Sequence, residues 1–187
     1  MENNIKNANQ AYIEGNYHEA CLIYLEEANK GNKSCCRMVG WMLLDGLGTE
    51  ANTDKALSFF ERGSIDGNAE SIFGEARCYM KLSNFDEALV ILNRLAERDY
   101  PPANYWLGKF YKFGYGVVKN RKIALSYYKK AARSRHLYAS REEAILLLQG
   151  VDGFIGRFLG IWKLCRSIAN AIDIGMRDGS RDPRWLI

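Results

Sequence analysis

The sequence has few prolines and few residues suited to catalysis. Its 187 residues include 3 prolines, too few for a proline-rich disordered chain, and 48% of them are apolar, enough for a folded core. The 2 histidines, His18 and His136, are far apart, and no HxxxH or Cys/His cluster accompanies them. We therefore predict no catalytic residue, no cofactor and no metal site, and we expect both histidines to be surface or turn residues.

Secretory and membrane-spanning segments are also missing. The opening segment, residues 1–4, is polar, so no signal peptide is expected. The longest apolar stretch of the C-terminal third is interrupted by Asp152, Arg157 and Lys163, which argues against a membrane span. The cysteines are odd in number and form no CxxC pair: Cys21, Cys35, Cys36, Cys78 and Cys165. We expect reduced, buried thiols in a cytoplasmic protein.

Acidic residues are absent from one long window. Residues 1–100 carry 10 Lys and Arg against 16 Asp and Glu, whereas residues 101–140 carry no acidic residue. The basic residues of this window are Lys109, Lys112, Lys119, Arg121, Lys122, Lys129, Lys130, Arg133 and Arg135. Such a one-sided charge indicates an anionic partner more strongly than the net charge of +4 does.

The sequence does contain an internal repeat. Three glycines recur 68 residues apart, as Gly40 and Gly108, Gly46 and Gly114, and Gly48 and Gly116. The segment at 55–60 recurs at the same offset, at 123–128. Four alanines spaced 36, 32 and 36 residues apart mark four units, at Ala20, Ala56, Ala88 and Ala124. This periodicity predicts stacked structural repeats.

Each repeat has the residue spacing of two helices. In the first unit, Ala20, Tyr24 and Ala28 share one helical face, and Gly15-Asn16 breaks the pattern before them. An alanine at each anchor position lets paired helices approach closely. The sequence therefore predicts an all-α chain.

These motifs resemble the tetratricopeptide repeat. The second and fourth units resemble its Sel1-like variant, which adds the Gly-x-Gly turn found at residues 46–48 and 114–116, and the third unit resembles a plain tetratricopeptide repeat. The resemblance covers residues 3–139 and implies a right-handed α-solenoid of antiparallel helix pairs that binds other proteins. We divide the chain into a solenoid at 1–150, with four units and a half-unit, and a long C-terminal amphipathic helix with a polar tail at 151–187.

The Gly-x-Gly segments have a second interpretation as phosphate-binding loops. Such a loop needs a preceding strand, and no strand is expected before either segment. We therefore interpret these glycines as residues of positive φ between consecutive helices.

The family resemblance also places candidate binding residues. The first helix of each tetratricopeptide unit lines a concave groove, and the matching positions here are Arg37, Trp41, Arg77, Met80, Tyr105, Lys109 and Lys112. Their cations favour a protein partner with an acidic segment, or phosphate-bearing headgroups, while a solvated charged face is the alternative. Nucleic acid is not favoured, because no nucleic-acid module accompanies the charge.

Residues 151–176 have the apolar period of a long amphipathic helix. Three roles fit it: a cap on the solenoid, a membrane-surface helix, or a docking helix for another protein. A cap would bury Phe154, Phe158 and Trp162 against Ile145 and Leu148. The spacing of Gly156 and Gly160 would suit close approach to another helix. The candidate membrane or partner residues are Phe154, Phe158, Trp162, Lys163 and Arg166.

The sequence as a whole predicts a non-enzymatic adaptor or scaffold in a bacterial-type cytoplasm. We expect it to dock a protein partner in its groove and to associate with a membrane, or a membrane machine, through the C-terminal helix. The alternative is a peripheral regulator of a cell-surface polysaccharide or secretion system at the inner face of the membrane. An enzyme is the least favoured class, because no polar cleft or cofactor motif is indicated.

Overall fold

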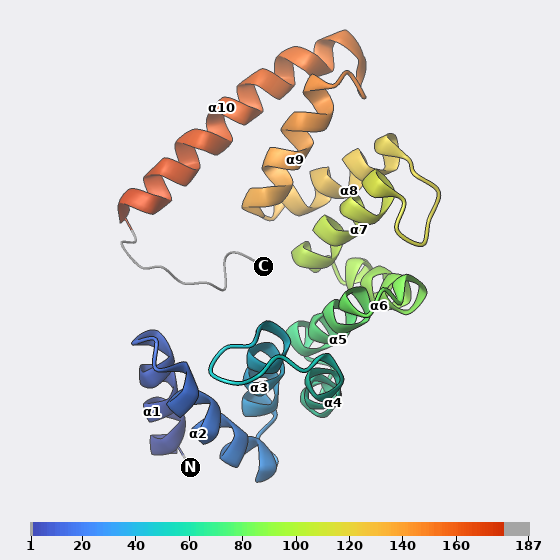
Figure 1. Ribbon diagram of the computed structural model, residues 1–187. Coiled ribbons are helices and arrows are strands. Elements are labelled where there is room, and N and C mark those ends of the chain that lie inside the picture. The colour runs from blue at the N-terminus through green and yellow to red at the C-terminus, as the bar shows by residue number, and fades with distance from the viewer. Residues whose placement is uncertain (1, 178–187) are drawn as a thin grey trace. The chain divides into compact units, whose positions relative to one another are not determined.

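The computed structural model describes residues 2–177, without the side chains of Glu2, Ser167 and residues 170–177 (Figure 1). Every regular element in this range is an α-helix: α1 (Glu2–Ile13), α2 (Tyr17–Asn29), α3 (Lys33–Asp45), α4 (Thr53–Ser64), α5 (Ala69–Lys81), α6 (Phe85–Glu97), α7 (Pro101–Phe113), α8 (Arg121–Arg133), α9 (Leu137–Leu148) and α10 (Gly153–Arg177). The predicted all-α solenoid with a long C-terminal helix is confirmed.

Helices that follow one another along the chain pack together. Within the helix pairs, α1 packs on α2, α3 on α4 and α7 on α8. Contacts between consecutive pairs join α2 to α3, α4 to α5 and α8 to α9. The chain divides into two compact units, residues 1–91 and residues 92–187, with the boundary inside α6. The division predicted from the sequence, at residue 150, stays a prediction.

Polar caps begin several of these helices at matching repeat positions. The side chains of Asn32, Asn52, Asn68 and Asn120 each accept a hydrogen bond from a backbone N–H in the first turn of the helix that follows. Such a cap satisfies an N–H that has no partner within the helix and contributes about 1 kcal/mol. The repeated asparagines therefore fix where each of these helices starts.

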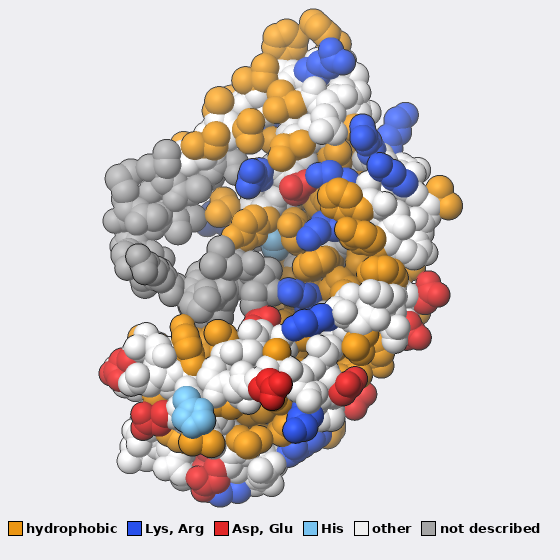
Figure 2. All heavy atoms as spheres, in the orientation of Figure 1, with side chains coloured by type: hydrophobic (Ala, Val, Ile, Leu, Met, Phe, Trp, Pro, Cys, Tyr) orange, Lys and Arg blue, Asp and Glu red, His pale blue; other side chains and the backbone are white. Residues whose placement is uncertain are grey.

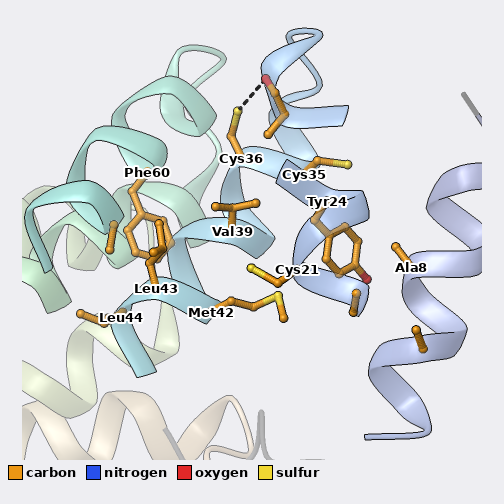
Figure 3. Packing of buried hydrophobic residues seen from close by; sticks show 14 of the residues in the cluster. Ala8, Cys21, Tyr24, Cys35, Cys36, Val39, Met42, Leu43, Leu44 and Phe60 are labelled. Atoms are coloured by element: carbon orange, nitrogen blue, oxygen red, sulfur yellow. Dashed lines mark hydrogen bonds between the residues drawn. The ribbon is translucent and has the colours of Figure 1, made fainter. Parts of the chain in front are cut away.

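The core of the first unit is centred on α2, α3 and α4, with further buried residues from α1 and α5. Val39 and Met42 of α3 point between Tyr24 of α2 and Phe60 of α4 (Figure 3). The anchor alanines Ala20 and Ala56 are fully buried, as expected for sites where helices approach closely. Four of the five cysteines, Cys21, Cys35, Cys36 and Cys78, are buried as free thiols.

In the second unit, α8 and α9 supply most of the core. Ala124, Tyr128 and Ala131 of α8 are fully buried with Leu146 and Leu147 of α9. Because α9 lies between α8 and α10, it is the scaffold on which the C-terminal helix rests.

The Gly-x-Gly segments are turns after helices, as interpreted from the sequence. Gly48 has a φ of +70°, and a Cβ at this position would collide with the backbone of Tyr17. The ring nitrogen Nδ1 of the neighbouring His18 lies 3.0 Å from the Gly48 carbonyl oxygen. Gly48 is therefore required for both its positive φ and the close approach of α2.

Candidate functional site

The described residues contain no cluster with the composition of a metal centre. No group of three or more His, Cys, Asp or Glu side chains within them is placed to hold a metal ion. The same part of the chain includes no helix that combines the length and apolarity needed to cross a membrane.

The candidate groove residues of the first unit lie on α3 and α5, which are in contact. Arg37 Nε lies 3.1 Å from Glu70 Oε2, so its charge already has a carboxylate partner. The Trp41 ring packs edge-on against Phe60 with a centroid separation of 4.9 Å, which makes Trp41 partly a core residue. Arg77 and Met80 of α5 are half-buried.

The candidate groove residues of the second unit, Tyr105, Lys109 and Lys112, lie on α7. Lys112 Nζ donates to Glu142 Oε2 of α9 at 2.5 Å. Lys109 Nζ lies 4.0 Å from the centroid of the Trp106 ring and 5.8 Å from that of Tyr105, in cation–π geometry. Lys112 is thus paired with a carboxylate of the chain, and Lys109 lies over two half-buried aromatic rings.

Sequence reasoning missed an aromatic cluster around Tyr105. The His136 imidazole stacks on Tyr105 at 4.7 Å between ring centroids, and Tyr138 lies 6.4 Å from the same ring. His136 Nδ1 accepts a hydrogen bond from the Ala139 N–H and caps α9. Burial lowers the pKa of His136, which keeps the imidazole neutral at physiological pH.

A repeat-length offset in the sequence would have indicated these unexpected partners. His136 follows the capping residue Asn68 by 68 residues, which is the offset of the glycine motifs. Glu70 follows Arg37 by 33 residues, about the length of one repeat. Residues that hold similar places in neighbouring repeats are close in space, so an offset of about one repeat predicts ion pairs between repeats.

The C-terminal helix packs on α9 through its glycines. A Cβ at Gly160 would lie 2.8 Å from the Leu148 nitrogen and 2.9 Å from the Ala144 carbonyl oxygen, so the two backbones are in contact there. Lys163 Nζ donates to Glu143 Oε1 at 2.6 Å, and Glu143 is only 3% exposed. The glycine side of α10 and one largely buried ion pair therefore hold this helix on α9.

The large apolar side chains of α10 point away from α9, contrary to the packing expected of a cap. Phe154, Phe158 and Trp162 are 71%, 61% and 55% exposed. A cap would have packed these side chains on Ile145 and Leu148; they are exposed instead, because the glycine side allows a closer backbone approach than the aromatic side. We call the exposed side the outer face of α10, made of Phe154, Ile155, Phe158, Leu159, Ile161, Trp162, Cys165 and Ile168.

A sequence model of the Sel1 repeat matches residues 33–68 and 101–136. These two segments are similar to the Sel1 repeat. They comprise α3 with α4 and α7 with α8, the two pairs that carry the Gly-x-Gly turn. No curated protein matches the sequence significantly.

Several solved structures share the fold of this chain. A Sel1 repeat protein from Oxalobacter formigenes is 18% identical, with a TM-score of 0.73 over 88% of this chain and 69% of its own. A protective antigen of uropathogenic Escherichia coli strains, displaying an SLR fold, is 22% identical, with a TM-score of 0.63 over 95% of this chain and 42% of its own. MamA is 15% identical, with a TM-score of 0.60 over 90% of this chain and 96% of its own. These likenesses concern the fold.

Sel1-repeat proteins are generally scaffolds for protein interaction, and the fold is typically non-enzymatic.

Proposed function

We propose that this protein is a non-enzymatic adaptor that holds an acidic segment of a partner protein against α7. The observation that carries the proposal is the position of Lys109 over the rings of Tyr105 and Trp106. An acidic residue could pair with this ammonium group while the neighbouring apolar atoms pack on the rings.

The charge distribution supports this choice of partner. Residues 101–140 carry no acidic residue, so a partner carboxylate meets no repulsion from this window. Arg37 of α3 and Arg77 of α5 have a smaller role in the proposal, because they lie on other helices than α7. Lys112 of α7 pairs with Glu142 of α9.

Site-specific photo-crosslinking in the full-length protein tests the proposal. A benzophenone side chain in place of Tyr105 should capture a partner protein, whereas the same group in place of the exposed Leu22 of α2 should not. Lys109→Glu should remove the adduct without unfolding the protein, and added salt should weaken it because exposed charges are screened over about 10 Å. Equal capture from both positions, or capture that is indifferent to Lys109→Glu, would exclude α7 as the docking surface.

A second candidate function is that of a peripheral membrane protein, including a regulator of a polysaccharide or secretion machine at the inner face of the membrane. The observation that favours it is the outer face of α10. A row of exposed Phe, Ile and Trp side chains on a helix with Lys and Arg is typical of helices that lie in a lipid interface. A cytoplasmic location fits the five unpaired cysteines.

A further inference from the structure

The outer face of α10 is broad, continuous and bordered by arginines. Its apolar residues recur at helical spacing and, at about 100° per residue, cover an arc of about 180° around the helix. Arg157 and Arg166 are exposed at the two edges of this arc, and the Arg166 guanidinium carbon lies 5.3 Å from the centroid of the Trp162 ring. Cationic groups therefore lie along the border of the apolar outer face.

A patch of exposed cations adjoins the beginning of the same helix. Lys119, Arg121 and Lys122, which we call the α8 patch, are all exposed. They line a shallow depression with Gly150 and Val151, and Lys122 lines a second one that reaches Gly153, the first residue of α10. Figure 2 shows hydrophobic side chains along α10 and Lys and Arg side chains beside its first turns.

The repeat itself gives no reason for cations in the α8 patch. The positions 68 residues earlier hold Thr53 and Asp54 in place of Arg121 and Lys122, and α4 forms equally well. A helix N-terminus carries partial positive charge and favours acidic residues, so two basic residues there act against the helix. Within the described residues, no carboxylate pairs with any cation of the α8 patch.

We infer that the outer face of α10 and the α8 patch together form one binding surface for an anionic lipid bilayer. The inference builds on the proposed peripheral membrane role and names its ligand. The outer face enters the interface between headgroups and acyl chains, and the α8 patch, Arg157 and Arg166 contact the phosphates. A second copy of this chain fits less well, because pairing two outer faces brings the same cations of each copy close together.

Vesicle cosedimentation with the full-length protein tests this inference. The probes are vesicles of pure phosphatidylcholine and vesicles of equimolar phosphatidylcholine and phosphatidylglycerol. The apolar variant is Phe158→Ser with Trp162→Ser, and the charge variant is Arg121→Glu with Lys122→Glu. Both should fold, since the first pair is exposed and the second places acidic residues in the first turn of α8.

The matched control is Lys130→Glu with Arg133→Glu. It makes the same change in net charge on exposed residues of the same helix, at the opposite end of α8. Circular dichroism and thermal melts of every variant verify folding before the vesicle assay.

The wild type should bind the anionic vesicles at least about ten-fold more strongly than the neutral ones. The apolar variant and the charge variant should each bind the anionic vesicles about ten-fold more weakly than the wild type, whereas the control should bind them as the wild type does. No binding by the wild type overturns the inference, as does equal loss in the charge variant and the control. A wild-type dimer that the apolar variant disperses, without lipid binding, assigns the outer face to a second copy instead. The Tyr105 crosslink should survive in both variants, so failure here leaves the α7 proposal standing.

Discussion

At the scale of single residues, glycines of one helix make room for aromatic rings of the next. A Cβ at Gly108 of α7 would lie 2.5 Å from the Tyr128 ring of α8, and Gly40 of α3 stands in the same relation to Phe60 of α4. Both rings are fully buried. The 68-residue recurrence of these glycines therefore reflects close packing of each helix pair as well as turn geometry.

Gly108→Ala should destabilise the protein even though alanine is the better helix former. Overpacking against the Tyr128 ring costs about 1–3 kcal/mol, which offsets the propensity gain of about 1 kcal/mol. Urea unfolding should show a lower midpoint than for the wild type. Lys130→Ala, at an exposed position, should change the free energy of unfolding by less than about 0.5 kcal/mol. If both substitutions have the same effect, the ring is not confined as described.

His136 should make stability depend on pH. Its pKa is lowered by burial, so the unfolded chain binds a proton more readily, and stability falls as the pH drops from about 7 to about 5. Protonation would also remove the Nδ1 lone pair that caps α9. His136→Asn keeps a capping oxygen and should flatten this part of the pH profile in urea melts, whereas an unchanged profile would assign the dependence to other groups.

At the scale of the helices, the repeat pattern predicted where the buried and turn residues lie, but it did not predict which side of α10 faces away from α9. The anchor alanines and Gly-x-Gly turns were placed correctly, because every unit must bury the same positions to stack on its neighbour. α10 has no counterpart in the other repeats, and the sequence left three roles open for its apolar stripe, of which only the cap requires the stripe to face inward. Backbone contact at Gly160 instead turns Phe158 and Trp162 outward, and a hydrophobic period alone does not distinguish these two packings.

The ion pair between Lys163 and Glu143 should measurably hold α10 on α9. Lys163→Met would leave the buried Glu143 carboxylate without its partner, at a cost of about 1–3 kcal/mol. Thermal melts should show this loss, and adding Glu143→Leu should recover most of it, because no buried charge then remains. A double variant no more stable than Lys163→Met alone would show that the ion pair does not act as described.

At the scale of the whole molecule, the two compact units carry opposite charge. Residues 1–91 hold 8 Lys and Arg with 14 Asp and Glu, while residues 92–187 hold 18 and 8. The outer face of α10 belongs to the basic unit. An anionic surface would therefore attract the second unit and repel the first. The net charge of the whole chain understates the attraction of the second unit to such a surface.

Truncation after Gln149 should affect stability and surface binding together. Removing α10 uncovers the side of α9 around Ala144 and Leu147, so the melting temperature should fall by several degrees or more. The same deletion removes the outer face and should abolish binding to anionic vesicles. A truncated protein as stable as the full chain would show that α10 contributes nothing to closing the second unit.

The exposed thiol of Cys165 gives the outer face a built-in attachment point for a spectroscopic label. The other four cysteines are buried, and burial raises the pKa of Cys35 to about 11 and that of Cys78 to about 12, so their reactive thiolates are scarce near neutral pH. A maleimide fluorophore should therefore modify the native chain at one position, amid the apolar side chains of α10. Its emission would report directly whether water, lipid or protein lies against this helix, with no engineered cysteine and no residue removed.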